Sequence, residues 1–128
     1  MVCYISNTPE PDRPTWDDRQ PIYLQLADHL AARLLDGEPP EGDAMPSVRT
    51  LATQHLLNPL TVSRALQALS DNGLLETRRG LGVYVRPGAR AHLKSTEREH
   101  FLANEWPNLR QRLRRLGLGP KDLIWEDA

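Results

Sequence analysis

The chain has 128 residues, which is enough for one domain with appended segments, because a domain usually takes roughly 100 to 200 residues. Its formal net charge of −1 favours no particular partner, and its single cysteine excludes an internal disulfide bond. The sequence holds neither a basic-then-apolar signal pattern nor an apolar run near the roughly 18 residues of a membrane span, so we expect a cytoplasmic protein without a membrane partner.

The basic residues are concentrated in the middle of the chain. Residues 1–48 hold three basic and nine acidic residues, residues 49–94 hold seven and two, and residues 95–128 hold six of each. A charge of +5 on the middle segment is expected if this segment alone faces phosphate groups. The simpler alternative is that these charges only solvate one face of the protein.

A flexible leader and an amphipathic helix are expected at the start of the chain. Residues 1–19 carry several prolines among polar residues, and Trp16 is the one residue there suited to packing. From Pro21 onward apolar side chains recur at every fourth position, and Gly37 marks the end of the helical pattern. The recurring residues are Ile22, Leu26, Leu30 and Leu34. We expect His29, on the same helix, at the surface.

A turn-rich linker, residues 38–44, leads to a second short helix that Ser47 caps. Apolar residues at positions 48, 51 and 52 face inward on this helix, whereas Arg49 and Thr50 face outward. Arg49 lies in the first turn, where backbone N–H groups also point outward, so it can reach a phosphate or a base edge. The alternative is an ordinary surface arginine.

The central helix is expected between Asn58, which is a good N-cap, and the Asn72-Gly73 pair, which is a typical stop. Its apolar stripe consists of Val62, Ala65, Leu66 and Leu69. The opposite face carries Leu60, Ser63, Arg64 and Gln67. A small helix with one narrow apolar stripe and these polar groups opposite it suits insertion into a DNA major groove.

An alternating pattern over residues 74–85 predicts a β-hairpin, in which Leu75 and Thr77 pair with Val83 and Val85 on the inner face. Two arginines, Arg78 and Arg79, precede a Gly80-Leu81-Gly82 tip. The two glycines let the backbone approach another molecule closely. A nucleotide-binding loop would need a helix after the second glycine, and a strand-like segment stands there instead.

Residues 88–128 predict a helical tail with an apolar stripe at heptad spacing. The stripe consists of Leu102, Trp106, Leu109, Leu113 and Leu116. Pro107 predicts a kink or break near residues 103–106, and residues 121–126 can add another helical turn or two. The stripe either folds back on its own domain or pairs with a second copy, and we favour pairing because such an exposed stripe is unusual on a monomer.

Four motifs in a fixed order between residues 20 and 86 resemble the winged helix-turn-helix domain of GntR-type bacterial transcription regulators. They are P-I-Y-x-Q, G-x-x-x-P-S-x-R, T-V-x-x-A-L-x-x-L and R-x-G-x-G-x-x-V. The resemblance implies a mainly α fold with a small β-hairpin, the wing. The expected domains are a flexible leader over 1–19, the winged helix-turn-helix over 20–87 and a helical dimerisation segment over 88–128.

The short tail and the Asn58-Pro59 pair are similar to the YtrA subfamily of these regulators. That resemblance implies a homodimer formed through C-terminal helices, and regulation of the chain's own operon or of a transport operon. A tail of this length is too short to enclose an ordinary ligand pocket, so a small-molecule effector is not expected.

The resemblance implies that Arg49, Thr61 and Gly82 contact DNA. The sequence departs from the family at positions 59 and 63, where many members carry arginine and this chain has Pro59 and Ser63. Its arginine stands at position 64, so a base preference does not carry over. The complete set of predicted DNA-binding residues is Arg49, Thr50, Asn58, Leu60, Thr61, Ser63, Arg64, Gln67, Arg79, Gly80 and Gly82.

The sequence therefore predicts a homodimeric transcription repressor that binds an inverted-repeat operator in double-stranded DNA. The main alternative is a winged-helix module that binds proteins without DNA. An enzyme is not expected, because no Ser/His/Asp set, C-x-x-C motif or Walker loop is present. His92 and His100 are eight residues apart, but with no carboxylate cluster beside them we predict no metal site and no cofactor.

Overall fold

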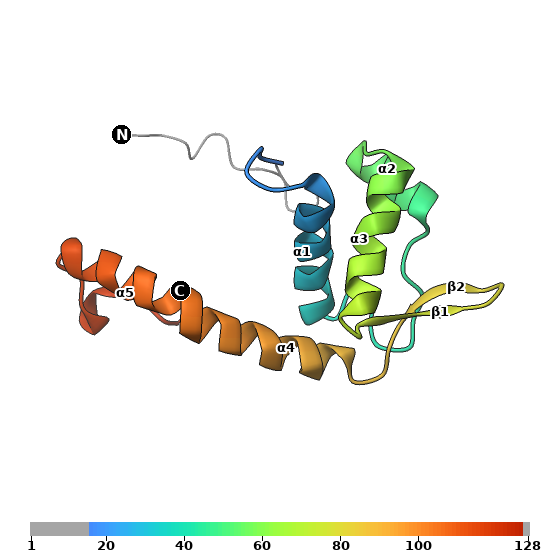
Figure 1. Cartoon of the computed structure of the whole chain (residues 1–128). Helices are drawn as coiled ribbons and strands as arrows, with labels where there is room; N and C mark the ends of the chain where they lie inside the picture. Colours follow the sequence, from blue (N-terminus) through green and yellow to red (C-terminus); the bar gives the residue numbers. More distant parts are fainter. Residues whose placement is uncertain (1–15, 127–128) are drawn as a thin grey trace. The chain divides into compact units, whose positions relative to one another are not determined.

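The computed structural model describes residues 16–126 as helices with a two-stranded antiparallel hairpin (Figure 1). Two compact units meet at Leu93 and Lys94. The first unit holds α1 (Ile22–Leu35), α2 (Val48–His55), α3 (Pro59–Asp71), β1 (Leu75–Arg78), β2 (Gly82–Val85) and the start of α4. The second holds the rest of α4 (Ala89–His100), then η2 (Phe101–Glu105), α5 (Trp106–Arg115) and η3 (Pro120–Asp122). The expected fold class, mainly α with a hairpin, is confirmed.

The first helix, α1, begins after Pro21, whose φ of −55° is already close to the helical value. Leu26, Leu30 and Leu34 are buried, as the fourfold spacing predicts, and pack against α3. The helix ends where Gly37 takes a φ of +84°, a conformation that costs glycine little.

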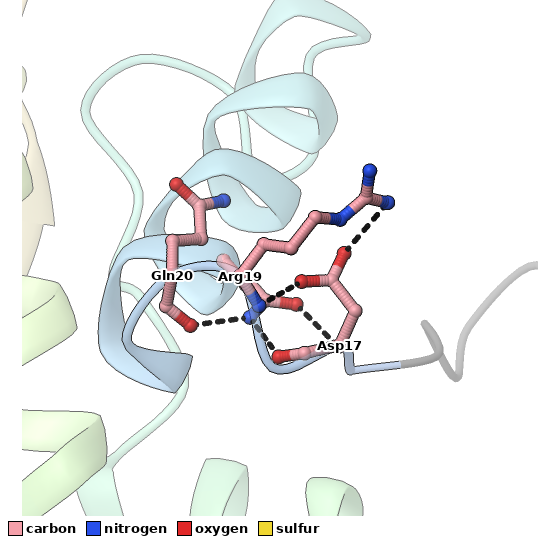
Figure 2. A network of polar contacts seen from close by, with 4 residues as sticks. Asp17, Arg19 and Gln20 are labelled. Atoms are coloured by element: carbon pink, nitrogen blue, oxygen red, sulfur yellow. Dashed lines mark hydrogen bonds and ion pairs between the residues drawn. The ribbon is translucent and has the colours of Figure 1, made fainter.

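A chain of short hydrogen bonds fixes the segment that leads into α1 (Figure 2). The Gln25 side chain donates to the carbonyl oxygens of Asp17 and Gln20, both at 2.8 Å, and accepts from the Asp17 N–H at 3.0 Å. The Asp17 carboxylate accepts from the Arg19 N–H at 2.8 Å. Gln25 is the glutamine of the P-I-Y-x-Q motif, so this motif holds the start of the helix in place.

The helix-turn-helix consists of α2, a tight turn and α3. The Ser47 hydroxyl accepts from the Thr50 N–H at 3.1 Å and caps α2. Leu56, 74% exposed, then takes a left-handed φ of 57°, which turns the chain toward Asn58. Figure 1 shows α1 and α3 side by side, with α2 near the start of α3 and the hairpin at its end.

In the hairpin, Leu75 pairs with Val85, and Thr77 with Val83. Leu75 and Val85 are buried, but Thr77 is exposed, so its expected place on the inner face is wrong. The linker also joins this sheet through an isolated bridge between Ala44 and Tyr84. One bridge beside prolines and a glycine leaves no alternating pattern, so sequence reasoning missed it.

Three aromatic rings pack between the chain before α1, α1 itself and α2. Trp16 packs against the core, as expected, and its ring centroid lies 6.1 Å from that of His55. His55 is only 6% exposed, and its ring lies 5.5 Å from the half-buried His29. The expectation that His29 lies at the surface is wrong, because the second ring covers it. The prediction of a flexible leader falls mostly on residues 1–15, outside the described residues.

The second unit contains the predicted irregularity. Residues Phe101–Glu105 form a π-helical turn, in which the Trp106 N–H donates to the Phe101 carbonyl oxygen five residues earlier. Pro107 has no N–H to continue an α-helical ladder, which explains the irregular turn before it. The π-helical turn lies where a kink or break near residues 103–106 was predicted, and the helical backbone continues through it. The expected helical turns over 121–126 are replaced by a single 3₁₀ turn, Pro120–Asp122.

Candidate nucleic-acid interface

The solvent-facing side of α3 carries the predicted reading residues. Val62, Ala65, Leu66 and Leu69 are all buried, which commits the opposite side of the helix to solvent. Leu60 is 73% exposed, and Ser63 and Gln67 are also exposed. The Gln67 amide donates to the Asp71 carboxylate at 2.9 Å, which leaves its carbonyl oxygen and its second N–H for a base edge.

Three of the predicted residues take part in helix capping or are partly covered. The Asn58 carboxamide oxygen accepts from the Leu60 N–H at 2.8 Å and caps α3. The Thr50 hydroxyl accepts from Ser47 at 2.9 Å at the start of α2. Thr61 is half-buried. Asn58 and Thr50 thus bond at a helix start, and only their remaining polar atoms are open to a ligand.

Ion pairs engage some arginines of the first unit and leave others open. Arg33 and Arg78 form ion pairs with glutamates, at 3.3 Å and 3.5 Å. In contrast, no hydrogen bond or ion pair joins the side chains of Arg49, Arg64 or Arg79 to another described residue. All three are exposed. The predicted DNA-binding arginines therefore keep their donors and their charge available for phosphates or bases.

Arg64 has one aromatic neighbour. Its guanidinium carbon lies 4.1 Å from the centroid of the Tyr23 ring on α1. This distance is typical of a cation–π contact, which uses the face of the guanidinium group and leaves its N–H edges free.

The wing ends in a tight turn in which the Leu81 N–H donates to the Arg78 carbonyl oxygen at 2.8 Å. Gly80 has a φ of +77° and Gly82 a φ of +115°, so both positions need glycine. Leu81 between them is 69% exposed. Leu81 is not among the predicted DNA-binding residues.

Arg78 is not among the predicted DNA-binding residues either. Unlike Arg79, it is engaged by other side chains. Its guanidinium carbon lies 4.1 Å from the Tyr84 ring centroid, and its nitrogen lies 3.5 Å from the Glu76 carboxylate. All three side chains lie on the wing, so Arg78 stiffens the hairpin.

The predicted dimerisation stripe lies in the second unit. Leu102, Leu109 and Leu116 are exposed, whereas Trp106 and Leu113 are half-buried. The π-helical turn separates Leu102 from the α-helical part of the stripe, because heptad spacing assumes an uninterrupted α-helix. Further along, Ile124 and Trp125 are 89% and 95% exposed. The described residues of this unit thus expose several large apolar side chains.

The arrangement of support helix, turn, exposed helix and glycine-tipped hairpin matches known proteins. The sequence profile described as "Bacterial regulatory proteins, gntR family" matches residues 22–85, which is half of the chain. The chain belongs to the GntR family. The matched region begins at α1 and ends with β2, so it contains every predicted DNA-binding residue.

Relatives of this GntR-family chain are also regulators. It is 31% identical over 105 residues to the HTH-type transcriptional regulator YhcF of Bacillus subtilis, a match that covers 82% of this chain and 85% of YhcF. It is 42% identical over 73 residues to the HTH-type transcriptional repressor YtrA of the same organism, covering 57% of this chain and 56% of YtrA. A GntR-family transcriptional regulator from Listeria monocytogenes superposes with a TM-score of 0.67 at 28% identity, covering 83% of this chain and 91% of that structure.

The family and these relatives make the chain a DNA-binding transcriptional regulator and not an enzyme. Within residues 16–126, no group of three histidine, cysteine or acidic side chains is placed to hold a metal ion. Over the same residues, no helix combines the length and the apolar character needed to cross a membrane.

Proposed function

We propose that the chain is a homodimeric repressor that binds an inverted-repeat operator. The observation that carries the proposal is the exposed face of α3, which bears Arg64, together with Arg49 on α2 and Arg79 in the wing. No described residue engages the donors of these arginines. In water such donors are solvated, and a phosphate or base edge offers them charge-assisted hydrogen bonds.

The proposed contacts divide into positioning and reading. Arg49 and Thr61, with Thr50 and Asn58 beside them, set the register on phosphates from the two helix starts. Leu60, Ser63, Arg64 and Gln67 read base edges in the major groove, where an exposed leucine can contact a thymine methyl group. Arg79, Gly80 and Gly82 bring the wing against the minor groove or the adjacent backbone.

We propose that the C-terminal segment, residues 88–128, pairs with the same segment of a second copy. Its exposed leucines and its exposed Trp125 support this pairing, because burial of apolar area drives association. Two copies related by a twofold axis read two half-sites about one helical turn apart. Residues 20–87 then form the DNA-binding part and residues 1–19 a leader to it.

Repression is proposed by analogy with the YtrA repressor of Bacillus subtilis, to which the chain is 42% identical over 73 residues. A dimer bound across a promoter blocks polymerase without any contact beyond DNA. The chain's own operon or a transport operon is the proposed target.

The test begins with a DNA site selected from a random pool by the full chain. We expect the selected site to contain an inverted repeat, and binding to weaken steeply with salt while the preference over random DNA remains. Absence of binding at any salt concentration would instead favour the alternative function, a module that binds other proteins through the same scaffold.

A further inference from the structure

The recognition helix does not hold its arginine alone. We propose that Tyr23, on α1, is a positioning residue for base recognition: its ring orients the Arg64 guanidinium before DNA is bound. This inference rests on the proposed function, because it assigns a role within the reading of the operator. If Tyr23 orients Arg64, then α1 contributes to the choice of DNA sequence and does not only support the two following helices.

Arg64 and Tyr23 are in contact. The Arg64 guanidinium carbon lies 4.1 Å from the Tyr23 ring centroid, and no other described residue bonds to that guanidinium group. A free arginine side chain samples many rotamers, and all but one must be given up on binding. A ring under the guanidinium face restricts this freedom in advance, while the N–H edges remain available for two parallel bonds to guanine or a phosphate.

The Tyr23 ring is held in place by its surroundings. Tyr23 is half-buried and packs against the core, one residue after the start of α1. Two residues later, Gln25 ties the preceding segment to the helix through three hydrogen bonds to Asp17 and Gln20 (Figure 2). The core therefore holds the Tyr23 ring, and the polar network holds the segment just before α1.

The wing holds a second arginine–tyrosine contact, between Arg78 and Tyr84. Arg78 stacks on Tyr84 at the same distance, 4.1 Å, but there a glutamate occupies the donor edge of the guanidinium group at 3.5 Å. Arg64 has the ring without the carboxylate. The same pair of residue types thus stiffens the hairpin in one place and presents an open donor edge in the other.

The experiment first measures the contact in the free full-length chain. Ring currents from Tyr23 shift the side-chain protons of Arg64, so we expect NMR signals of Arg64 that move in Tyr23→Leu and stay in place in Tyr23→Phe, which keeps the ring. Unchanged Arg64 signals in Tyr23→Leu would show that the two groups are not stacked in solution and would overturn the inference without touching the proposed function.

The second measurement is a double-mutant cycle on the selected DNA site and on the same site with one base pair changed at a time. Arg64→Ala should weaken binding roughly fivefold to a hundredfold and relax discrimination at one base pair. Tyr23→Leu should cost about two- to fivefold at that base pair, Tyr23→Phe should restore most of it, and Tyr23→Leu should add nothing once Arg64 is alanine.

Two further variants keep the result interpretable. Tyr84→Leu removes the matching stack on the wing and should combine additively with Arg64→Ala at every base pair. Arg64→Lys keeps the charge at an exposed position, and it should lose discrimination at the same base pair as Arg64→Ala. This variant can be studied even if Tyr23→Leu is too unstable. Additive effects of Tyr23→Leu and Arg64→Ala would overturn the inference while DNA binding stands. A wild-type chain that selects no DNA site would overturn the proposed function, with the NMR signature still present.

Discussion

Asn58 carries two roles at one residue, a helix cap and a proposed phosphate contact. Its carboxamide oxygen accepts the Leu60 N–H at 2.8 Å, so Asn58→Ala should lower the free energy of unfolding by about 1 kcal/mol. Asn58→Asp keeps an acceptor and should keep that stability, but should weaken DNA binding by placing a negative charge near phosphates. Urea denaturation and DNA titration of both variants separate the roles. Equal DNA affinity for the wild type and Asn58→Asp would remove Asn58 from the proposed interface.

The backbone of Gly82 provides a second test at the residue scale. Its φ of +115° is strained for any other residue, although an added Cβ would meet no atom within 4 Å. We therefore expect Gly82→Ala to cost about 1 to 3 kcal/mol of backbone strain, which would loosen the wing tip and weaken DNA binding. Hydrogen exchange of the hairpin amides measures this. Gly119→Ala, at an extended φ of −120°, is the matched control and should change little.

Side chains in contact across elements were the least predictable part of the candidate site. The helical period correctly placed Leu60, Ser63 and Arg64 on the exposed side of α3, because the apolar stripe leaves no other orientation. The ring under Arg64 comes from a residue 41 positions earlier, and no local spacing signals such a contact. His29 was misplaced for the same reason: the ring that covers it lies on another helix.

At the scale of elements, the start of α4 is fixed by Glu41 in the linker. The Glu41 carboxylate accepts from the N–H groups of Gly88 at 3.0 Å and Arg90 at 3.1 Å, and these bonds lower the pKa of Glu41. Arg90 also donates to the Leu35 carbonyl oxygen at 2.7 Å. The linker and the ends of two helices thus form one polar junction.

This junction predicts a pH dependence. Because the folded-state pKa of Glu41 lies below its ordinary value of 4.5, the ionised carboxylate stabilises the fold at neutral pH, and this stabilisation is lost as the pH falls through the folded pKa. Glu41→Gln should therefore lower the urea midpoint at pH 7 and differ progressively less from the wild type below pH 4.5. A constant difference at all pH values would contradict the assignment.

Most elements followed from local sequence signals. Caps at Ser47 and Asn58, the stop at Gly73 and the glycine-tipped hairpin were all readable, because each depends on the chemistry of a few adjacent residues. Pro107 indicated a break but not its form, since a lost N–H permits a kink, a gap or the observed π-helical turn. The bridge between Ala44 and Tyr84 depends on tertiary packing and left no local trace.

At the scale of the whole molecule, the proposed dimer makes a prediction about mass and affinity. Replacing two exposed leucines of the stripe, Leu109→Ser with Leu116→Ser, should leave the fold intact and reduce the mass in solution from two chains to one. Operator affinity should fall by about a hundredfold or more, because two linked half-site contacts become independent. Sedimentation and DNA titration measure both effects. Gln111→Ser, also exposed on α5, is the control, and a double variant that remains a dimer would place the interface elsewhere.

The linker between α1 and α2 is bonded to two separate parts of the chain within a few residues. Glu41 holds the first residues of α4, while the N–H groups of Gly42 and Met45 donate to β2 at 2.9 Å and 2.8 Å. The start of α4 and the second strand of the wing are thus both bonded to the same five linker residues, 41–45. A displacement of the first residues of α4 would therefore strain the bonds that join this linker to β2.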